Sequence, residues 1–219
     1  MSLNANLNRR FDEDFCANPA QRLAGEKGDL CFVEYQFQLG YVWPWFMLGA
    51  TTFRPKFTVE KTQFRQFDAS SVELAGTWER RLLKSIDLSG LFTYSIERIR
   101  QFHADTNVDN QTLRIGAITP GLRLDLRDSS LAPTTGWYSS TSFEYASTWL
   151  LSQKDPVPLG YSRFQYRLDR YIPLFKNVTW FLSFRTGFEK NLEVQTDGGP
   201  EDLRYSIPLI KQFALGGAG

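Results

Sequence analysis

The sequence contains few of the residues on which catalytic and metal sites are usually built. Its 219 residues include two cysteines, two methionines and a single histidine. A structural zinc site usually takes four cysteine or histidine ligands, so three such residues predict no zinc site. His103 has no serine or cysteine nucleophile motif near it. We therefore expect a protein that is not an enzyme and that holds no metal ion.

Long apolar runs are also missing. A transmembrane helix needs roughly 18 or more consecutive apolar residues, whereas the most apolar stretch, Leu39 to Ala50, is about twelve residues long and contains Pro44. The first ten residues show no apolar core of a secretory signal, so an export signal would have been removed or would lie outside this sequence. The sequence therefore predicts no membrane-spanning helix.

An excess of one charge is absent as well. Lys and Arg number 25 and Asp and Glu 24, which leaves a net charge of +1. Nucleic-acid-binding proteins are expected to carry a basic excess or stripe, so we expect no nucleic-acid partner. Aromatic residues, in contrast, are abundant at 15%, although the hydrophobic content of 42% is ordinary for a globular protein.

The main positive signal is an alternation of apolar and polar residues with a period of two. In the segment 163–172, Phe164, Tyr166 and Leu168 lie on one face. Arg163, Gln165 and Arg167 lie on the other. Similar alternation occurs at 33–45, 86–96 and 178–188, with shorter versions at 53–59, 72–78 and 143–151. If residues 2–11 are included, the pattern predicts about nine strands and no long helix.

The linkers between these segments alternate in length. Short linkers (83–85 and 174–177) separate longer polar ones (61–69, 103–111, 153–158 and 191–202). Short periplasmic turns and long extracellular loops are typical of a transmembrane antiparallel β-barrel of the bacterial outer membrane. A soluble β-sandwich also alternates, but bulky aromatic faces and strands longer than ten residues favour a barrel in lipid. The polar faces would then line a wet interior.

The charged residues of the segment 163–172 determine which face meets lipid. An arginine or lysine that faces lipid at the bilayer midplane costs roughly 2 to 4 kcal/mol. A shift by one residue would turn Arg163 and Arg167 toward lipid, so the shifted register is excluded and the unshifted one is fixed. The segment 113–127 changes its apolar face between Gly116 and Gly121, which predicts a bulge or a bend there.

Three stretches of the chain match motifs of a known family. They are Tyr41-Val-Trp-Pro-Trp-Phe46, then Gly121-Leu-Arg-Leu-Asp-Leu-Arg-Asp128 continued by Ser-Ser-Leu-Ala-Pro133-Thr-Thr-Gly136-Trp-Tyr, and Ile207-Pro-Leu209 followed by Phe213-Ala-Leu-Gly-Gly217-Ala-Gly219. The first is similar to a strand end and periplasmic turn of the BamA/TamA outer-membrane assembly family. The second resembles the "D-x-R-D … P-x-x-G" strand, turn and next strand of that family. The third resembles the run that leads into its sixth extracellular loop, which folds back inside the barrel.

The resemblance extends from about Gly28 to Gly219 and implies roughly the third to eleventh strands of a sixteen-stranded barrel. We expect residues 1–219 to form one outer-membrane β-barrel domain fragment, with the periplasmic POTRA domains and the final strands outside it. The resemblance implies a factor that folds and inserts client barrels without a nucleotide or other cofactor. Its implied partners are outer-membrane lipids and client β-barrel proteins, with accessory lipoproteins or periplasmic chaperones beside them. The alternative is a secretion or translocation pore of the same superfamily that exports a dedicated partner protein.

Two groups of candidate residues belong to the second motif. Four charged residues project from one strand face and its end: Arg123, Asp125, Arg127 and Asp128. We expect them to form a charge network at the lumen and the periplasmic rim that steadies the barrel and its inserted loop, and ordinary lumenal ion pairs are the alternative. Pro133 and Gly136 are predicted to form the turn.

Three further groups complete the candidates. The resemblance implies that Gly216 and Gly217 form the base of the inward-folding loop, where glycine permits close backbone approach; plain loop glycines are the alternative. Cys16 and Cys31 flank a polar stretch, so they form either a disulfide in an extracellular loop or two unpaired thiols. Three aromatic residues are predicted as anchors at the membrane interface: Trp43, Trp45 and Phe46.

Overall fold

The computed structural model describes residues 2–9, 33–46, 51–63, 68–83, 85–102, 112–154, 158–175 and 178–192. Within these ranges it contains nine β-strands and one short 3-10 helix. The strands are β1 (Ser2–Arg9), β2 (Val33–Gly40), β3 (Thr51–Gln63), β4 (Asp68–Leu83), β5 (Leu88–Phe102), β6 (Thr112–Asp125), β7 (Gly136–Ala146), β8 (Tyr161–Phe175) and β9 (Val178–Asn191), and the helix is η2 (Thr148–Leu150). None of the described residues form a helix long and apolar enough to cross a membrane.

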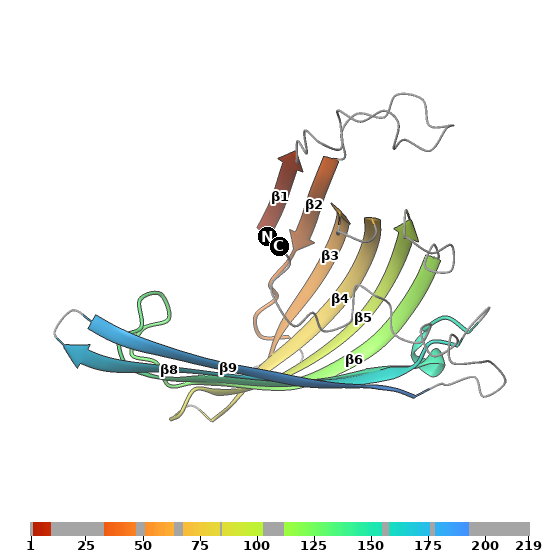
Figure 1. Cartoon of the computed structure of the whole chain (residues 1–219). Coiled ribbons are helices and arrows are strands. Elements are labelled where there is room, and N and C mark those ends of the chain that lie inside the picture. Colours follow the sequence, from red (N-terminus) through yellow and green to blue (C-terminus); the bar gives the residue numbers. More distant parts are fainter. Residues whose placement is uncertain are drawn as a thin grey trace.

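All nine strands belong to one sheet in which each strand pairs antiparallel with its neighbours in sequence. The sheet is strongly curved, and its concave side lies between β1–β6 and the β8–β9 hairpin (Figure 1). β4 has 16 residues, and β5 and β8 have 15 each, which exceeds the roughly 9 to 11 residues that a tilted strand needs to cross a bilayer. The predicted all-β fold with about nine antiparallel strands is confirmed.

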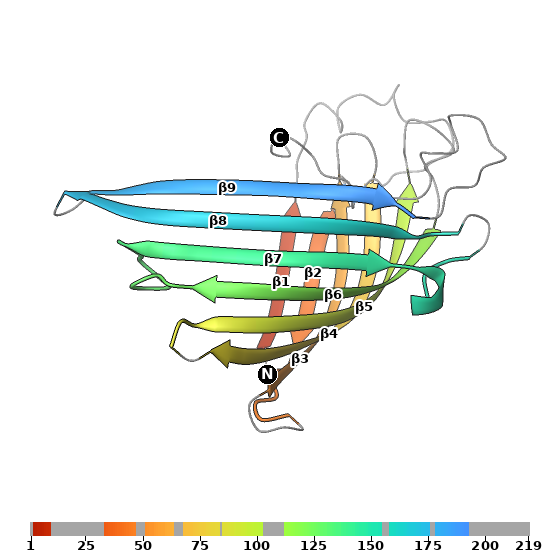
Figure 2. The same ribbon diagram turned by 90° about the horizontal axis from the view of Figure 1, so that it is seen from below.

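The strands are connected at two opposite ends of the sheet (Figure 2). Residues 41–50, 84–87, 126–135 and 176–177 connect strands at one end, which we call the turn end. Residues 64–67, 103–111 and 147–160 connect them at the other, the loop end. The connection between β3 and β4 is shorter than the predicted linker 61–69, because β3 continues to Gln63 and β4 begins at Asp68.

Successive side chains of each strand point to opposite faces of the sheet. The inward face lies on the concave side of the sheet, and the outward face lies on the convex side. Phe37, Phe164 and Leu182 lie on the outward face, and Arg163 and Arg185 on the inward face. Phe37 is 36% and Leu182 is 41% exposed, so these side chains do not meet in an apolar core. The predicted separation of these apolar side chains from the arginines, on opposite faces of the sheet, is confirmed.

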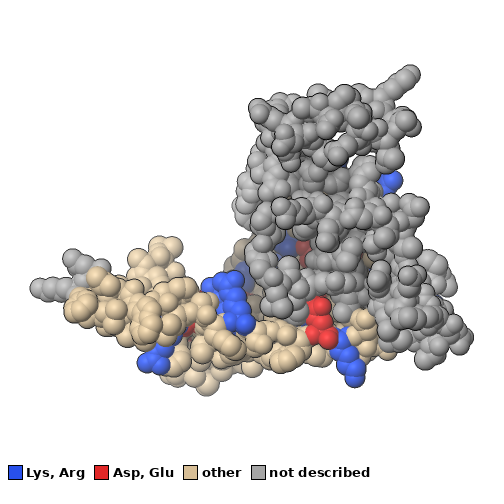
Figure 3. Space-filling view, in the orientation of Figure 1, with Lys and Arg blue, Asp and Glu red and all other residues tan. Residues whose placement is uncertain are grey.

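Large apolar side chains cover the outward face. In the space-filling view, most of the visible surface of the described residues is neither basic nor acidic (Figure 3). The exposed apolar residues include Val72, Leu74, Phe92, Leu122, Phe143, Trp180, Phe184 and Phe188. Exposing one such side chain to water costs about 1.5 to 3 kcal/mol relative to burying it. A continuous face of them is typical of a surface that contacts a membrane or a protein partner.

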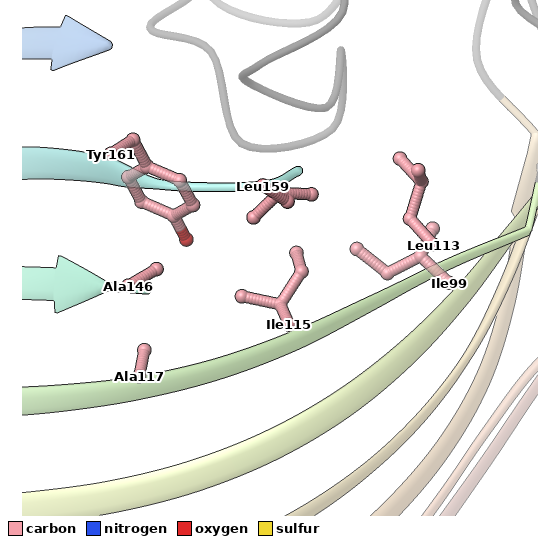
Figure 4. Packing of buried hydrophobic residues seen from close by; sticks show 7 residues of the cluster. All are labelled: Ile99, Leu113, Ile115, Ala117, Ala146, Leu159 and Tyr161. Atoms are coloured by element: carbon pink, nitrogen blue, oxygen red, sulfur yellow. The ribbon is translucent and has the colours of Figure 1, made fainter. Parts of the chain in front are cut away.

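The inward face becomes apolar near the loop end. Seven buried side chains form a cluster there: Ile99, Leu113, Ile115, Ala117, Ala146, Leu159 and Tyr161. Residues of β5 and β6 face Leu159, which precedes β8, and Tyr161 at its start, across the inner side of the curve (Figure 4). The β6 members of this cluster explain why the apolar residues of segment 113–127 change face. Of the two predicted alternatives, a bulge or a bend, the bulge is absent, because β6 pairs with β5 from Thr112 to Leu124 without a shift of register.

Between β7 and β8 the chain leaves the sheet and crosses the outward side of β6; we call residues 147–153 the crossover. The carbonyl of Leu150 stands over Gly116, where an added Cβ would lie 1.8 Å from the carbonyl oxygen. The Ser152 hydroxyl donates to the Gly116 carbonyl at 2.9 Å and accepts the Gly116 N–H at 3.0 Å. The Gln153 N–H then donates to the Arg114 carbonyl at 2.8 Å. Glycine at position 116 therefore permits the crossover.

Candidate functional site

Charged side chains gather on the inward face near the turn end, around a hollow of about 660 Å³. Its lining contains five arginines and four carboxylates, so the charges nearly cancel. The lining residues are Thr52, Arg54, Glu79, Arg81, Asp87, Ser89, Arg123, Asp125, Arg127, Tyr138, Arg167 and Asp169. We call the charged members of this set the turn-end charge network.

Glu79 of β4 lies at the centre of the network. Its carboxylate accepts hydrogen bonds from Arg54 of β3 and Arg123 of β6, and both contacts are ion pairs. The Arg123 side chain reaches Glu79 across β5, where the small residue Ser89 stands opposite Arg123. The small Ser89 side chain leaves room for a long side chain to pass over it, and Ser89 is accordingly covered, at 7% exposed. One carboxylate thus connects three strands of the sheet.

Two further ion pairs extend the network to β7 and β8. Asp125 accepts two hydrogen bonds from the Arg127 guanidinium, at 2.8 and 2.7 Å, which is the strong two-point geometry of an arginine–carboxylate pair. Asp169 accepts a hydrogen bond from Arg167 at 2.8 Å. Both guanidinium groups lie over the Tyr138 ring, 4.8 and 5.6 Å from its centroid, so cation–π attraction adds to the ion pairs.

Asp128 lies in the turn 126–135 and does not line the hollow. Its carboxylate accepts the backbone N–H groups of Thr134 at 2.9 Å, Thr135 at 3.2 Å and Ser129 at 3.0 Å, together with the Thr134 hydroxyl. These donors, the Thr134 hydroxyl first, lower the pKa of Asp128 to about 2. The charge of Asp128 therefore organises the turn, while Arg123, Asp125 and Arg127 belong to the network.

The other end of this turn depends on Gly136. Its φ of +108° lies in the region that side chains with a Cβ rarely adopt. A Cβ at this position would also lie 2.1 Å from the Leu126 carbonyl oxygen. The Leu126 N–H donates to the Trp137 carbonyl at 2.8 Å, so the chain segments on either side of the turn approach closely. Pro133 lies within the same turn, where its ring limits φ.

The three aromatic residues predicted as interface anchors lie in the connection between β2 and β3: Trp43, Trp45 and Phe46. The Phe46 ring is 5.2 Å from that of Trp43 and 5.0 Å from that of Phe53. From Phe53 the row continues over the outward face through Trp78 and Phe92, with centroid distances of 4.8 and 5.9 Å. Trp45 is 76% exposed. Aromatic rings therefore continue from the β2–β3 connection across the turn end of three neighbouring strands, β3, β4 and β5.

A second polar group lies beside the apolar cluster at the loop end. Glu144 of β7 accepts a hydrogen bond from the Tyr161 hydroxyl at 2.5 Å and forms an ion pair with Arg163. The side chains of Glu144 and Arg163 are 12% and 17% exposed, so a matched pair of charges is shielded from water here. Within the described strands and turns, no three His, Cys, Asp or Glu side chains converge to hold a metal ion.

Several residues of these networks were not singled out from the sequence. Alternation places Glu79 and Glu144 on the polar face, but no local pattern indicates which arginines they meet, because this depends on register between strands. Four candidate residues lie outside the described residues: Cys16, Cys31, Gly216 and Gly217.

A comparison with known proteins agrees with this architecture. The family model of the Omp85 superfamily domain matches residues 20–219. The match covers β2 to β9, and with them the turn-end charge network and the apolar cluster. No curated protein matches the chain.

Proposed function

Because the chain belongs to the Omp85 superfamily, whose members act in outer-membrane protein assembly or secretion, we propose that it is part of an assembly factor that folds and inserts client β-barrel proteins. The chain is an outer-membrane β-barrel protein. In the proposed reaction, a client strand adds to an exposed strand edge of the barrel, where backbone N–H and C=O groups are free to pair. Such pairing requires no nucleotide, because hydrogen bonding and burial in lipid supply the free energy. Accessory lipoproteins or periplasmic chaperones would deliver the clients.

The observation that carries the proposal is the mutual compensation of inward charges at the turn end. Glu79 is held by Arg54 and Arg123, and Asp125 by Arg127. Charges that are paired with each other do not create the field of one sign that would steer a charged chain through a conduit. They do connect neighbouring strands into a firm wall. Such a wall favours the assembly function, because the barrel must stay folded beside the strand edge that opens to the client.

The second candidate function is a secretion pore for a dedicated partner chain. It is favoured by the polar hollow on the inward face and by Arg167 and Arg185, which stand opposite each other on β8 and β9 and face inward. Two neighbouring cations would attract acidic segments of a passing chain. Arg167 is already paired with Asp169, which weakens this attraction.

The two functions are separated by reconstitution of the intact protein in liposomes. A test barrel unfolded in urea is added, and its folding is followed by heat-dependent mobility on gels. The assembly factor is expected to raise the rate of insertion severalfold over liposomes that contain an unrelated porin. An unchanged rate with correctly folded protein would overturn the proposal. Entry of an unfolded partner chain into the liposome interior, without faster barrel insertion, would establish the secretion pore.

A further inference from the structure

Every charged side chain that the structure describes on the outward face of β2–β9 is basic. Strand register and alternation place seven such residues there: Lys61, Arg80, Arg98, Arg100, Arg114, Arg170 and Lys190. The described carboxylates of the same strands face the hollow, among them Glu73, Glu79, Glu144 and Asp169. The membrane-facing side of the protein thus presents positive charge alone within the described side chains.

Three of these residues lie side by side near the loop end, and we call them the arginine triad: Arg98, Arg100 and Arg114. Arg98 of β5 is directly opposite Arg114 of β6, and Arg100 follows on the same face of β5. All three are exposed, and the described residues contain no ion pair to any of them. Like charges that are directly opposite on neighbouring strands repel each other. An anion between the guanidinium groups would remove this repulsion.

The triad lies at the height of a lipid headgroup. Arg98 follows Leu88 by about ten positions, which is roughly 34 Å along the strand and, at a tilt of about 40°, roughly 26 Å across the membrane. The apolar band of an outer-membrane barrel is about 25 Å tall, and Phe92, Tyr94 and Ile96 occupy outward positions between the two residues. Short turns are periplasmic, so the loop end faces the outside of the cell. The triad, which lies near the loop end, is therefore at the boundary of the outer leaflet.

The crossover supplies apolar surface beside the triad. The Tyr94 hydroxyl donates to the Leu150 carbonyl at 3.3 Å, and the Trp149 ring is 6.2 Å from the outward-facing Tyr145. Both contacts place the crossover on the outward side of the sheet. Trp149 and Leu151 are 68% and 54% exposed. Tryptophan is enriched at membrane interfaces, where its ring meets both acyl chains and headgroups.

We propose that the arginine triad binds the phosphate groups of an anionic lipid in the outer leaflet. Guanidinium groups bind phosphate through two parallel N–H···O bonds, and three of them on two strands suit a headgroup with more than one phosphate. The acyl chains of the lipid lie below, against outward residues nearer the turn end such as Leu74 and Phe92, which are 59% and 43% exposed. The crossover borders the headgroup with Trp149. This site is independent of the proposed assembly function.

The test measures lipid binding by the intact protein in a neutral detergent. Lipid A with two phosphates is titrated, and bound lipid is counted by native mass spectrometry. The double variant Arg98→Gln/Arg114→Gln is expected to bind lipid A roughly thirtyfold more weakly. Each arginine near an anionic surface strengthens binding by a factor of about five, and the variant removes two. Lipid A without phosphates is expected to bind the unaltered protein as weakly as lipid A binds the double variant. Inorganic phosphate at the same concentration is expected not to displace the lipid.

The matched control is Arg80→Gln/Arg170→Gln, which removes two exposed outward arginines at the turn end. Equal loss of binding in both double variants would overturn the proposal, and so would undiminished binding of lipid A without phosphates. Displacement by inorganic phosphate would identify a free-phosphate site instead and would also overturn it. A second measurement needs no bound lipid: Arg114→Gln should raise the melting temperature in lipid-free neutral detergent, since it removes the repulsion from Arg98. A lower melting temperature would contradict the repulsive pair on which the proposal rests.

Discussion

A single glycine determines whether the turn between β6 and β7 can close. Gly136 has a φ of +108°, and a Cβ there would lie 2.1 Å from the Leu126 carbonyl oxygen. Backbone strain of this kind costs about 1 to 3 kcal/mol, and the steric overlap adds to it. Gly136→Ala should therefore lower the free energy of unfolding by about 2 kcal/mol or more, measured by urea titration of the folded barrel. Gly90→Ala is the control, because its Cβ would meet only the Leu82 side chain at 3.4 Å; an equal loss there would contradict the explanation.

The carboxylate of Asp128 provides a pH-dependent element of the same turn. Its pKa of about 2 in the folded protein lies below the ordinary value of 3.8. A depressed pKa means that the carboxylate stabilises the turn above about pH 4 and that this contribution is lost as the pH falls through about 2. The amide proton of Thr134, which donates to Asp128, should shift in NMR spectra of the protein in micelles with a midpoint near pH 2. Asp128→Asn should abolish the transition, and a midpoint near 4 would show that the donors do not bind the carboxylate.

Within a single strand, a substitution that breaks the alternation should lower the stability of the barrel by a measurable amount. Leu168 is in the middle of β8 and faces outward, while Gln165 of the same strand faces inward. Leu168→Arg should destabilise the barrel in a bilayer by about 2 to 4 kcal/mol, whereas Gln165→Arg should cost less than about 1 kcal/mol because the interior is wet. Both are measured by denaturant titration in liposomes. Equal effects of the two substitutions would contradict the assignment of the faces.

At the scale of the whole molecule, the ion pairs of Glu79 connect distant parts of the sheet. Glu79→Ala leaves Arg54 and Arg123 without this carboxylate, and their side chains are 43% and 37% exposed. Because solvent screens such partly exposed charges, we expect a loss of about 1 to 2 kcal/mol in stability. The control is Glu73→Ala, which removes a carboxylate with one cationic partner, Lys56.

Glu79→Ala and Glu73→Ala are compared with the unaltered protein by thermal unfolding at low and high salt. The excess loss in Glu79→Ala should shrink at about 1 M salt, where the screening length falls to about 3 Å. A loss that is independent of salt would indicate a packing defect in place of the electrostatic link between β3, β4 and β6.

Much of the fold was predictable because strand alternation is a local property. The apolar positions Phe164 and Leu168 and the polar positions Arg163 and Arg167 are separated by the geometry of an extended chain alone. The same reasoning was only partly right for the segment 113–127, because the bulge that it offered beside a bend is absent. There, Leu113 and Ile115 face inward because an apolar cluster lies at that height of the hollow, and no local pattern distinguishes such a cluster from a bulge.

The candidate site was predictable only in part. The motif around Arg123, Asp125 and Arg127 pointed to the turn end of the barrel, and Asp128 was grouped with them because it follows on the chain. The structure places Asp128 in a turn with Thr134, since a carboxylate there can reach several backbone N–H groups at once. The outward arginines were not grouped at all from the sequence, because Arg98 and Arg114 are far apart along the chain.

By itself the sequence determined, for most strands, which residues face lipid and which face water, since that choice follows from the two-residue period of an extended chain and from the cost of a charge in hydrocarbon. The tertiary structure decided which residues meet across strands: Arg123 with Glu79, Arg98 with Arg114, and the Leu150 carbonyl with Gly116. These contacts depend on strand register, on the curvature of the sheet and on the path of the crossover. Such properties arise only when segments distant in sequence hydrogen-bond to one another.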